Sequence, residues 1–476
     1  THFIINQLKP MRKNLFRLLV FCLCLAVSQA ATKRYSVEEF FQDPEFSSFV
    51  LSPDGKKMLA VAPNPGTGGF RNIFVIDVEN PTRGIQPLTA EERHVINVGW
   101  FNNERIYYGL LDRGVDSAGL WAVDVDGDNY RELAEPFVPE KREVFRYTAV
   151  LDILKDDKKH CLVVSNERRL NYPDVYLMDI RRGGKKRIVT NPGHVVGWLP
   201  DTEGVVRVGI EQDPQTDAIT ILYREDEDAD WEELRTFEDP DVTFTPVAFT
   251  PDGDSLVVSS NLKTDTRGLY LYDLDQRKIT EKIYQNPEYD AVGALFHRKT
   301  DELLGVRYAE EKVKTVYFDE GWAEFQAMLD QALPGYTNTF YSVDYDDSIA
   351  VVLSSSDRQP GVFYQFDMEN LSIRELARTR RWIKAEDMVA SRPITFQARD
   401  GLEIHGYLSL PASYQGQPVP LIVMPHGGPW ARDVWGYDPW VQYLANRGFG
   451  VLKVNFRGST GYGTAFYKAS FKNVEA

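Results

Sequence analysis

The chain has 476 residues, of which 43% are hydrophobic and 26% are charged; this is an ordinary soluble composition, and the length is too great for a single core. The formal net charge of −16 and the sequence pI of about 5.1 argue against a nucleic-acid partner, which normally requires a basic face. The 24 Tyr and 26 Phe favour strands.

Residues 11–30 have the three parts of a secretory signal peptide. Basic residues follow Met11, an apolar stretch covers Leu18–Val27, and small residues stand at Ser28 and Ala30. The apolar stretch is shorter than the about 20 residues that cross a bilayer. We therefore expect cleavage after Ala30 and a secreted or periplasmic protein without stable membrane insertion, with an uncleaved anchor as the alternative.

Cysteine is rare in this chain. Cys22 and Cys24 fall within the signal segment, which leaves Cys161 as the single cysteine of the mature chain. No internal disulfide can then form, and this is typical of a bacterial periplasmic or secreted enzyme rather than a small disulfide scaffold.

A strand-like unit recurs seven times after residue 50. Each unit opens with a turn signal such as Ser52-Pro53-Asp54-Gly55, followed by an apolar run. The seven runs are Met58–Val61, Ile106–Tyr108, Cys161–Val164, Val205–Val208, Leu256–Val258, Leu303–Val306 and Ile349–Val352. Each has a partner run: Ile73–Asp77, Leu120–Asp124, Val175–Asp179, Ile219–Tyr223, Leu269–Asp273, Thr315–Asp319 and Val362–Asp367.

The partner runs end 44 to 55 residues apart, and six of the seven end in Asp. An Asp at that position can bond its own backbone and start the next turn. A strand-rich repeat of this length is typical of propeller blades, which pack in a ring because one blade cannot bury both faces. We predict a seven-bladed β-propeller over 50–385, with tandem β-sandwiches as the alternative.

Residues 371–392 lose the alternation and become basic, and we interpret them as the exit from the propeller. From Pro393 an α/β pattern begins. The expected elements are a hairpin of Ile394–Ala398 and Ile404–Leu408, a buried strand at Pro420–Pro425, a helix at Tyr437–Arg447 and a second buried strand at Gly450–Phe456. Strand, helix and strand predict one crossover unit of an α/β fold.

The turn His426-Gly427-Gly428-Pro429 follows the first buried strand. Acyl transfer builds negative charge on a carbonyl oxygen, and backbone N–H groups around that oxygen stabilise it. Glycines allow this close approach because no Cβ intrudes. The turn therefore suggests acyl-transfer chemistry, with an ordinary glycine-rich turn as the alternative.

Residues 418–463 resemble the start of the catalytic domain of the prolyl oligopeptidase family, nearest its acylaminoacyl-peptidase branch. The matching motifs are Met424–Pro429 and Asn455–Gly463. A preceding seven-bladed propeller is also that family's domain order, so the resemblance covers roughly 35–476.

The resemblance implies roles for four residues. Gly428, together with Gly427, would be the oxyanion donor on the loop side. His426 and Arg457 would support the site structurally, and Arg457 would hold its loop by ion pairing rather than contact substrate.

The family also needs a Gly-x-Ser-x-Gly elbow, then an Asp and a His. The sequence has no Gly-x-Ser-x-Gly and no His after His426. We therefore expect a hydrolase domain truncated before its catalytic Ser, Asp and His, and a fragment that is inactive alone. The expected divisions are a leader at 1–10, the signal at 11–30, an N-terminal segment at 31–49, the propeller at 50–385 and the incomplete α/β-hydrolase domain at 386–476.

The function implied by the resemblance is that of a serine exo- or oligopeptidase acting on short peptides, with the propeller filtering substrates by size. A non-enzymatic propeller that binds a protein or peptide is the alternative, and a carboxylesterase is a third reading that the long propeller opposes. No cofactor is expected, and the seven histidines lack metal-ligand spacing. The oligomeric state is left open.

Overall fold

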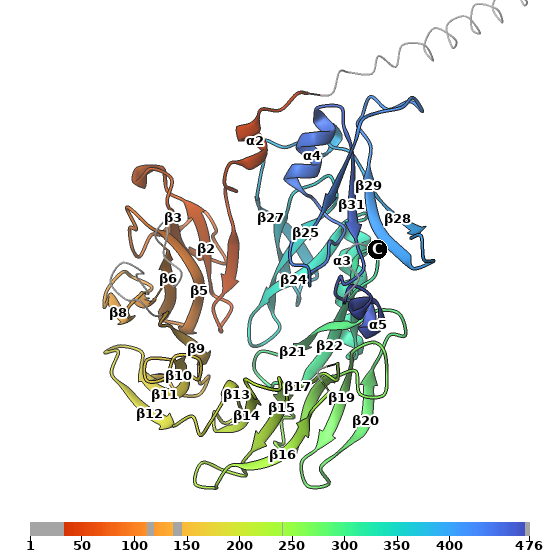
Figure 1. The fold of residues 1–476 in the computed structure, drawn as a ribbon. Coiled ribbons are helices and arrows are strands. Elements are labelled where there is room, and N and C mark those ends of the chain that lie inside the picture. The colour runs from red at the N-terminus through yellow and green to blue at the C-terminus, as the bar shows by residue number, and fades with distance from the viewer. Residues whose placement is uncertain (1–32, 112–118, 137–144, 240, 472–476) are drawn as a thin grey trace, which may run out of the picture.

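The computed structural model describes residues 33–111, 119–136, 145–239 and 241–471. The predicted signal peptide and its cleavage site lie outside these residues. Most of the described chain forms short antiparallel strands in separate small sheets (Figure 1).

Seven of these sheets follow one another along the chain, with strands paired in chain order. The first three contain β1 (Ser48–Leu51), β2 (Lys57–Pro63), β3 (Arg71–Asp77), β4 (Gly84–Ile85); β5 (His94–Asn102), β6 (Arg105–Leu111), β7 (Leu120–Asp124), β8 (Arg131–Ala134); and β9 (Thr148–Asp152), β10 (His160–Ser165), β11 (Asp174–Asp179), β12 (Lys185–Val189).

The next four sheets contain β13 (Val195–Pro200), β14 (Val206–Gln212), β15 (Ile219–Tyr223), β16 (Glu232–Phe237); β17 (Phe244–Phe249), β18 (Ser255–Ser260), β19 (Gly268–Asp273), β20 (Lys278–Tyr284); β21 (Ala291–Phe296), β22 (Leu303–Ala309), β23 (Val313–Tyr317); and β24 (Thr337–Val343), β25 (Ile349–Ser355), β26 (Val362–Asp367), β27 (Ser372–Arg378). We number the blades 1 to 7 in this order.

The blades pack into a closed ring, because each neighbouring pair shares a core of buried side chains. The last pair joins blade 7 to blade 1, where Phe363 packs edge-on against Phe49 at 4.9 Å between ring centroids. Leu51 N also donates to Ser342 Oγ at 3.0 Å across this junction. The predicted seven-bladed propeller is confirmed.

Blade 6 has three strands, and a helix follows where the other blades place a fourth strand. The predicted run Thr315–Asp319 is wrong at its end, because Asp319 caps helix α3 (Glu320–Ala332) by accepting from Trp322 N at 2.9 Å. Trp322 and Leu329 lie two helical turns apart and are buried in the core shared with blade 7.

The aspartates that end the partner strands have more than one role. Four of them accept backbone N–H groups two or three residues later, as expected: Asp77, Asp179, Asp273 and Asp367. Asp124 instead forms an ion pair of 2.6 Å with the fully buried Arg105, so the turn role is wrong there. That guanidinium also donates to Ile180 O at 2.7 Å, which joins blade 2 to blade 3.

The interpretation of residues 371–392 as the propeller exit is wrong for 372–378, which form β27, the fourth strand of blade 7. Most of this strand is exposed, so the apolar alternation that marks inner strands is missing. Arg374 donates to Val78 O and so helps to join blade 7 to blade 1.

The remaining sheet has the order β28-β29-β31-β30 and contains β28 (Ser391–Gln397), β29 (Glu403–Ser409), β30 (Leu421–Pro425) and β31 (Gly450–Asn455). β30 and β31 are parallel and connected through α4 (Pro439–Asn446), which confirms the crossover unit; α5 (Gly463–Lys468) follows β31. We call residues 391–471 the hydrolase segment.

The prediction that both crossover strands are buried holds for β31 but is wrong for β30. β30 lies at the edge of the sheet, and Leu421 and Val423 are 51% and 57% exposed. The continuous apolar sequence of β30 predicts contact with other apolar groups but does not say which element provides them. No described element covers this part of β30.

The N-terminal segment begins with α2 (Val37–Phe41), which lies beside α4 (Figure 1). Phe41 packs against Trp440 at 4.5 Å, and Phe40 packs edge-on against Tyr443 at 5.8 Å. Two short 3-10 turns complete the described helices, at Pro65–Thr67 and Ala385–Asp387. No helix in the described ranges is long and apolar enough to cross a membrane.

Candidate active site

The glycine turn lies at the carboxyl end of β30, on the exposed surface of the hydrolase segment. The backbone N–H groups of Gly427 and Gly428 donate no hydrogen bond to any described residue. Both glycines are exposed, so these two N–H groups are open to an acceptor that reaches the strand end. A developing oxyanion is such an acceptor.

His426 is held on both of its ring nitrogens. Its Nε2 lies 2.8 Å from Ser459 Oγ, and its Nδ1 lies 2.9 Å from Gly427 O. The ring also stacks on Phe456 at 4.5 Å and 21°. The Gly427 carbonyl can only accept, so Nδ1–H is the donor of that contact.

This contact fixes the peptide plane between Gly427 and Gly428. The C=O and N–H of a trans peptide point in opposite directions. Because the Gly427 carbonyl faces the His426 ring, the Gly428 N–H points away from it. The contact with His426 therefore sets the direction of the Gly428 N–H, which is the donor that the family resemblance implies for the oxyanion.

Gly428 has a backbone conformation that favours glycine. Its φ is +139°, and a Cβ built on it would lie 2.7 Å from Trp430 N. Gly427 differs, since a Cβ there would meet nothing within 4 Å. The two glycines are thus distinguishable by substitution.

Arg457 and Asp400 form a bidentate ion pair with distances of 2.8 and 3.0 Å. The pair joins the loop after β31 to the hairpin turn between β28 and β29. Hydrogen bonds from Arg457 lower the pKa of Asp400 to about 2. The geometry agrees with the ion-pairing role that the family resemblance implies for Arg457, and its structural support of the catalytic site stays a prediction.

Three further residues connect the turn to its surroundings, and the sequence analysis assigns them no role. Asn455 is fully buried; its Oδ1 accepts from Asp433 N at 2.7 Å, and its Nδ2 donates to Tyr462 OH at 2.7 Å. Arg432 also donates to Tyr462 OH, at 2.8 Å. Asn455 and Tyr462 lie within the motif Asn455–Gly463, which could have indicated them, whereas no sequence pattern marks Arg432.

An apolar hollow of about 530 Å³ lies beside the turn. Pro429 and Trp430 of the loop line it together with Phe396, Ile404, Val454 and Phe456 of the sheet. Trp430 is 58% exposed, so the hollow opens to solvent. An apolar side chain placed next to the free N–H donors would find apolar contacts here.

A second cavity, of about 660 Å³, lies within the ring and is lined by residues of blades 3 to 7. Residues from non-adjacent blades meet only near the axis of a ring, so this cavity marks the central channel. Lys155 of blade 3 forms an ion pair with Asp301 of blade 6 and donates to Lys299 O at 2.8 Å. These contacts cross the channel between blades that are not neighbours.

Metal-ligand clusters and a reactive thiol are two other features that can carry chemistry in a protein. No group of three or more His, Cys, Asp or Glu there could hold a metal ion. Burial raises the pKa of the Cys161 thiol to about 12, which keeps it protonated and unreactive.

Comparisons with known proteins match this chain to peptidases. Residues 435–474 match the model of the prolyl oligopeptidase family, Peptidase_S9. The chain is 28% identical over 454 residues to dipeptidyl aminopeptidase BIII of Pseudoxanthomonas mexicana, covering 92% of this chain and 63% of that protein. It is 44% identical over 64 residues to the acylamino-acid-releasing enzyme of Sus scrofa, covering 13% of this chain and 9% of that enzyme.

Solved structures extend the agreement to the fold. A crystal structure of puromycin hydrolase superposes with a TM-score of 0.62 at 18% identity, covering 90% of this chain and 69% of that one. The chain thus spans about three fifths of the length of the dipeptidyl aminopeptidase that it matches over most of its residues. Sequence and fold together confirm the resemblance of this chain to the prolyl oligopeptidase family.

Proposed function

We propose that the full-length protein containing this chain is a serine-type peptidase that hydrolyses short peptides. One observation carries the proposal: the unpaired N–H groups of Gly427 and Gly428 stand at the end of a strand, with the Gly428 donor aimed by His426. The peptidase relatives support the same reaction class. Residues outside the 476 supply the catalytic Ser, Asp and His.

In this mechanism a serine hydroxyl attacks the peptide carbonyl while a histidine takes its proton. The carbonyl oxygen becomes an anion, and the Gly428 N–H, assisted by Gly427, donates to it. Collapse of this intermediate expels the amine, and water then hydrolyses the acyl-enzyme. Loss of one such donor typically costs about 10²–10³ in turnover.

The propeller filters substrates by size in this proposal. Its ring is continuous from blade 1 to blade 7, and the Lys155–Asp301 pair crosses the channel. Folded proteins cannot pass such an opening, whereas short peptides reach the turn. The chain is exported, and its substrates are peptides outside the cytoplasm.

The test is hydrolysis by the full-length protein of a peptide series of increasing length. We expect turnover of short peptides and no cleavage of a folded protein. Equal cleavage of folded protein would contradict the filter. Absence of any hydrolysis would contradict the peptidase, and a peptide-binding propeller would then be the better account.

A further inference from the structure

The loop that follows the glycine turn reaches the propeller through one side chain. Arg432 Nη1 donates to Ala309 O and Nη2 donates to Glu310 O, each at 2.9 Å. Ala309 is the last residue of β22 and Glu310 begins the connection to β23; residues 309–312 are here called the blade 6 turn. The guanidinium presents paired donors in a fixed fork, so it can fix the separation of two carbonyls as a single-point cation cannot.

The same guanidinium is held on the hydrolase side. It lies 4.1 Å from the Tyr462 ring centroid, and Nη2 also donates to Tyr462 OH. Tyr462 accepts in addition from Asn455 Nδ2, at the end of β31. Arg432 therefore joins the blade 6 turn to the innermost part of the hydrolase segment.

Arg432 is also connected to the glycine turn over a short path. The neighbouring Ala431 donates from its N–H to Pro429 O at 2.9 Å and accepts from Thr460 N at 3.0 Å. Gly428 is packed so tightly that a Cβ would meet both Trp430 N and Ala431 N. A shift of Arg432 is therefore transmitted to the Gly428 N–H through a few covalent bonds in a crowded turn.

Each of the four residues of the blade 6 turn contacts the hydrolase segment. Besides Ala309 and Glu310, Glu311 O accepts from Tyr407 OH at 2.6 Å, and Lys312 Nζ lies 3.7 Å from the Trp435 ring centroid. Trp435 and Arg432 belong to the same loop, so this part of the propeller supports the loop on two sides.

We propose that Arg432 is a positioning residue that makes the placement of the Gly428 donor depend on contact with blade 6. This inference rests on the proposed peptidase function. When the hydrolase segment separates from the propeller, Arg432 loses both carbonyl acceptors and the turn loses its support.

The first arm of the test uses the 476-residue chain and needs no activity. Amide hydrogen exchange is measured for Arg432→Ala, Arg432→Lys and the control Arg392→Ala, an exposed arginine on β28. Two hydrogen bonds to a charged donor are lost in Arg432→Ala, so exchange should rise about tenfold or more in residues 309–312 and at the N–H groups of Ala431 and Thr460, which donate to Pro429 O and Ala431 O. The control should leave both sets of amides unchanged.

The second arm uses the full-length protein. Arg432→Ala should lower kcat by about 10- to 100-fold, because a small misplacement of a catalytic group has effects of that size, while KM changes by less than about twofold. Arg432→Lys keeps the charge but not the paired donors, so its kcat should be intermediate. A residue that merely stabilises the fold would not produce this split between kcat and KM.

Two results would overturn the proposal: an unchanged kcat in Arg432→Ala, or increased exchange in 309–312 without a change at Ala431 and Thr460. If Arg432→Ala does not fold, Arg432→Lys is judged by the same criteria. If the wild-type full-length protein is inert, the peptidase function fails, and the exchange arm alone decides whether blade 6 and the turn are coupled.

Discussion

His426 and Ser459 are joined side chain to side chain, with 2.8 Å between Nε2 and Oγ, although 33 positions separate them in the sequence. Ser459 is fully buried, and its Oγ also lies 2.7 Å from Phe456 O. The contact connects the loops that end the two parallel strands. It thereby holds the ring that orients the Gly427–Gly428 peptide.

Ser459→Ala should therefore allow the Gly428 N–H to depart from the direction that the His426 contact gives it. A typical hydrogen bond contributes about 0.5–1.5 kcal/mol, so kcat of the full-length protein should fall by up to about tenfold. Ser413→Ala, at an exposed serine in the β29–β30 connection, is the matched control. Full activity in Ser459→Ala would show that His426 is oriented without this contact.

The two glycines of the turn should respond differently to alanine. Gly428→Ala places a Cβ 2.7 Å from Trp430 N at a φ of +139°, so the turn must move and the donor with it. Turnover of the full-length protein should fall by about 10²–10³, as for loss of one oxyanion donor. Gly427→Ala meets no atom within 4 Å and should retain most activity. Equal losses in the two variants would contradict the assignment.

Much of this organisation could be predicted from the sequence. The seven paired runs defined the blades because a strand pair with a turn signal is a local pattern, and the glycine turn was found because its motif is contiguous. Helix α3 was not predicted, since Asp319 is compatible with both a strand end and an N-cap. The role of Arg432 depends on carbonyls about 120 positions away, which no local pattern encodes.

The Arg457–Asp400 pair should make the hairpin contact sensitive to acid. Arg457 lowers the pKa of Asp400 to about 2, whereas an unfolded Asp titrates near 3.9. The native state therefore binds fewer protons, so the stability from this pair is complete above about pH 4 and is lost as the pH falls towards about 2. The protection of the amides of residues 398–402, measured as exchange relative to the intrinsic rate at each pH, should fall over that interval. Asp400→Asn should abolish this acid-dependent loss of protection. A loss that persists in the variant would show that it does not come from the Arg457–Asp400 pair.

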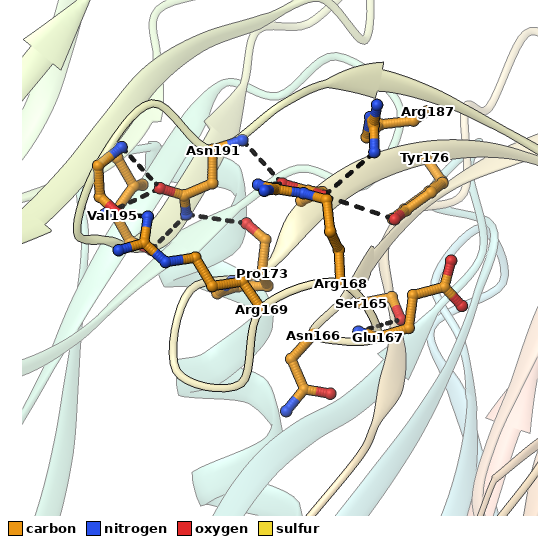
Figure 2. Close-up of polar contacts among 12 residues, drawn as sticks. Ser165, Asn166, Glu167, Arg168, Arg169, Pro173, Tyr176, Arg187, Asn191 and Val195 are labelled. Atoms are coloured by element: carbon orange, nitrogen blue, oxygen red, sulfur yellow. Dashed lines mark hydrogen bonds and ion pairs between the residues drawn. The ribbon is translucent and has the colours of Figure 1, made fainter.

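A buried carboxylate in blade 3 should be among the residues that matter most for propeller stability. The Asp174 side chain has no exposed surface and accepts from Arg168 Nε and Nη2 at 2.6 and 2.7 Å and from Asn191 N at 2.8 Å. Figure 2 shows Arg168, Arg187, Tyr176 and Asn191 around this position. Burial raises its pKa, but these hydrogen bonds prevail and the pKa of Asp174 is lowered overall.

Asp174→Ala should lower the free energy of unfolding by about 3 kcal/mol, because it removes the acceptor of a buried N–H and of an arginine. The control Asp346→Ala breaks an ion pair with Lys299 whose two side chains are 68% and 55% exposed. Such exposed pairs contribute about 0–1 kcal/mol. Urea unfolding followed by tryptophan fluorescence compares the two variants, and similar midpoints would contradict the structural role of Asp174.

Export is tested separately from activity. The small residues Ser28 and Ala30 predict cleavage after Ala30, so the exported protein should begin at Ala31. N-terminal sequencing of protein from the periplasm or the medium measures this directly. A mature protein that retains Leu18–Val27 would contradict the prediction.

The most direct test of the central claim is labelling by a fluorophosphonate probe, which reacts with activated serines. The full-length protein should be labelled on one serine outside the 476 residues, whereas the 476-residue chain should not be labelled, because its sequence has no Gly-x-Ser-x-Gly nucleophile motif. Mass spectrometry identifies the modified residue. Labelling of the 476-residue chain would contradict the placement of the nucleophile outside it, and a full-length protein that resists the probe and hydrolyses no peptide would contradict the serine peptidase assignment.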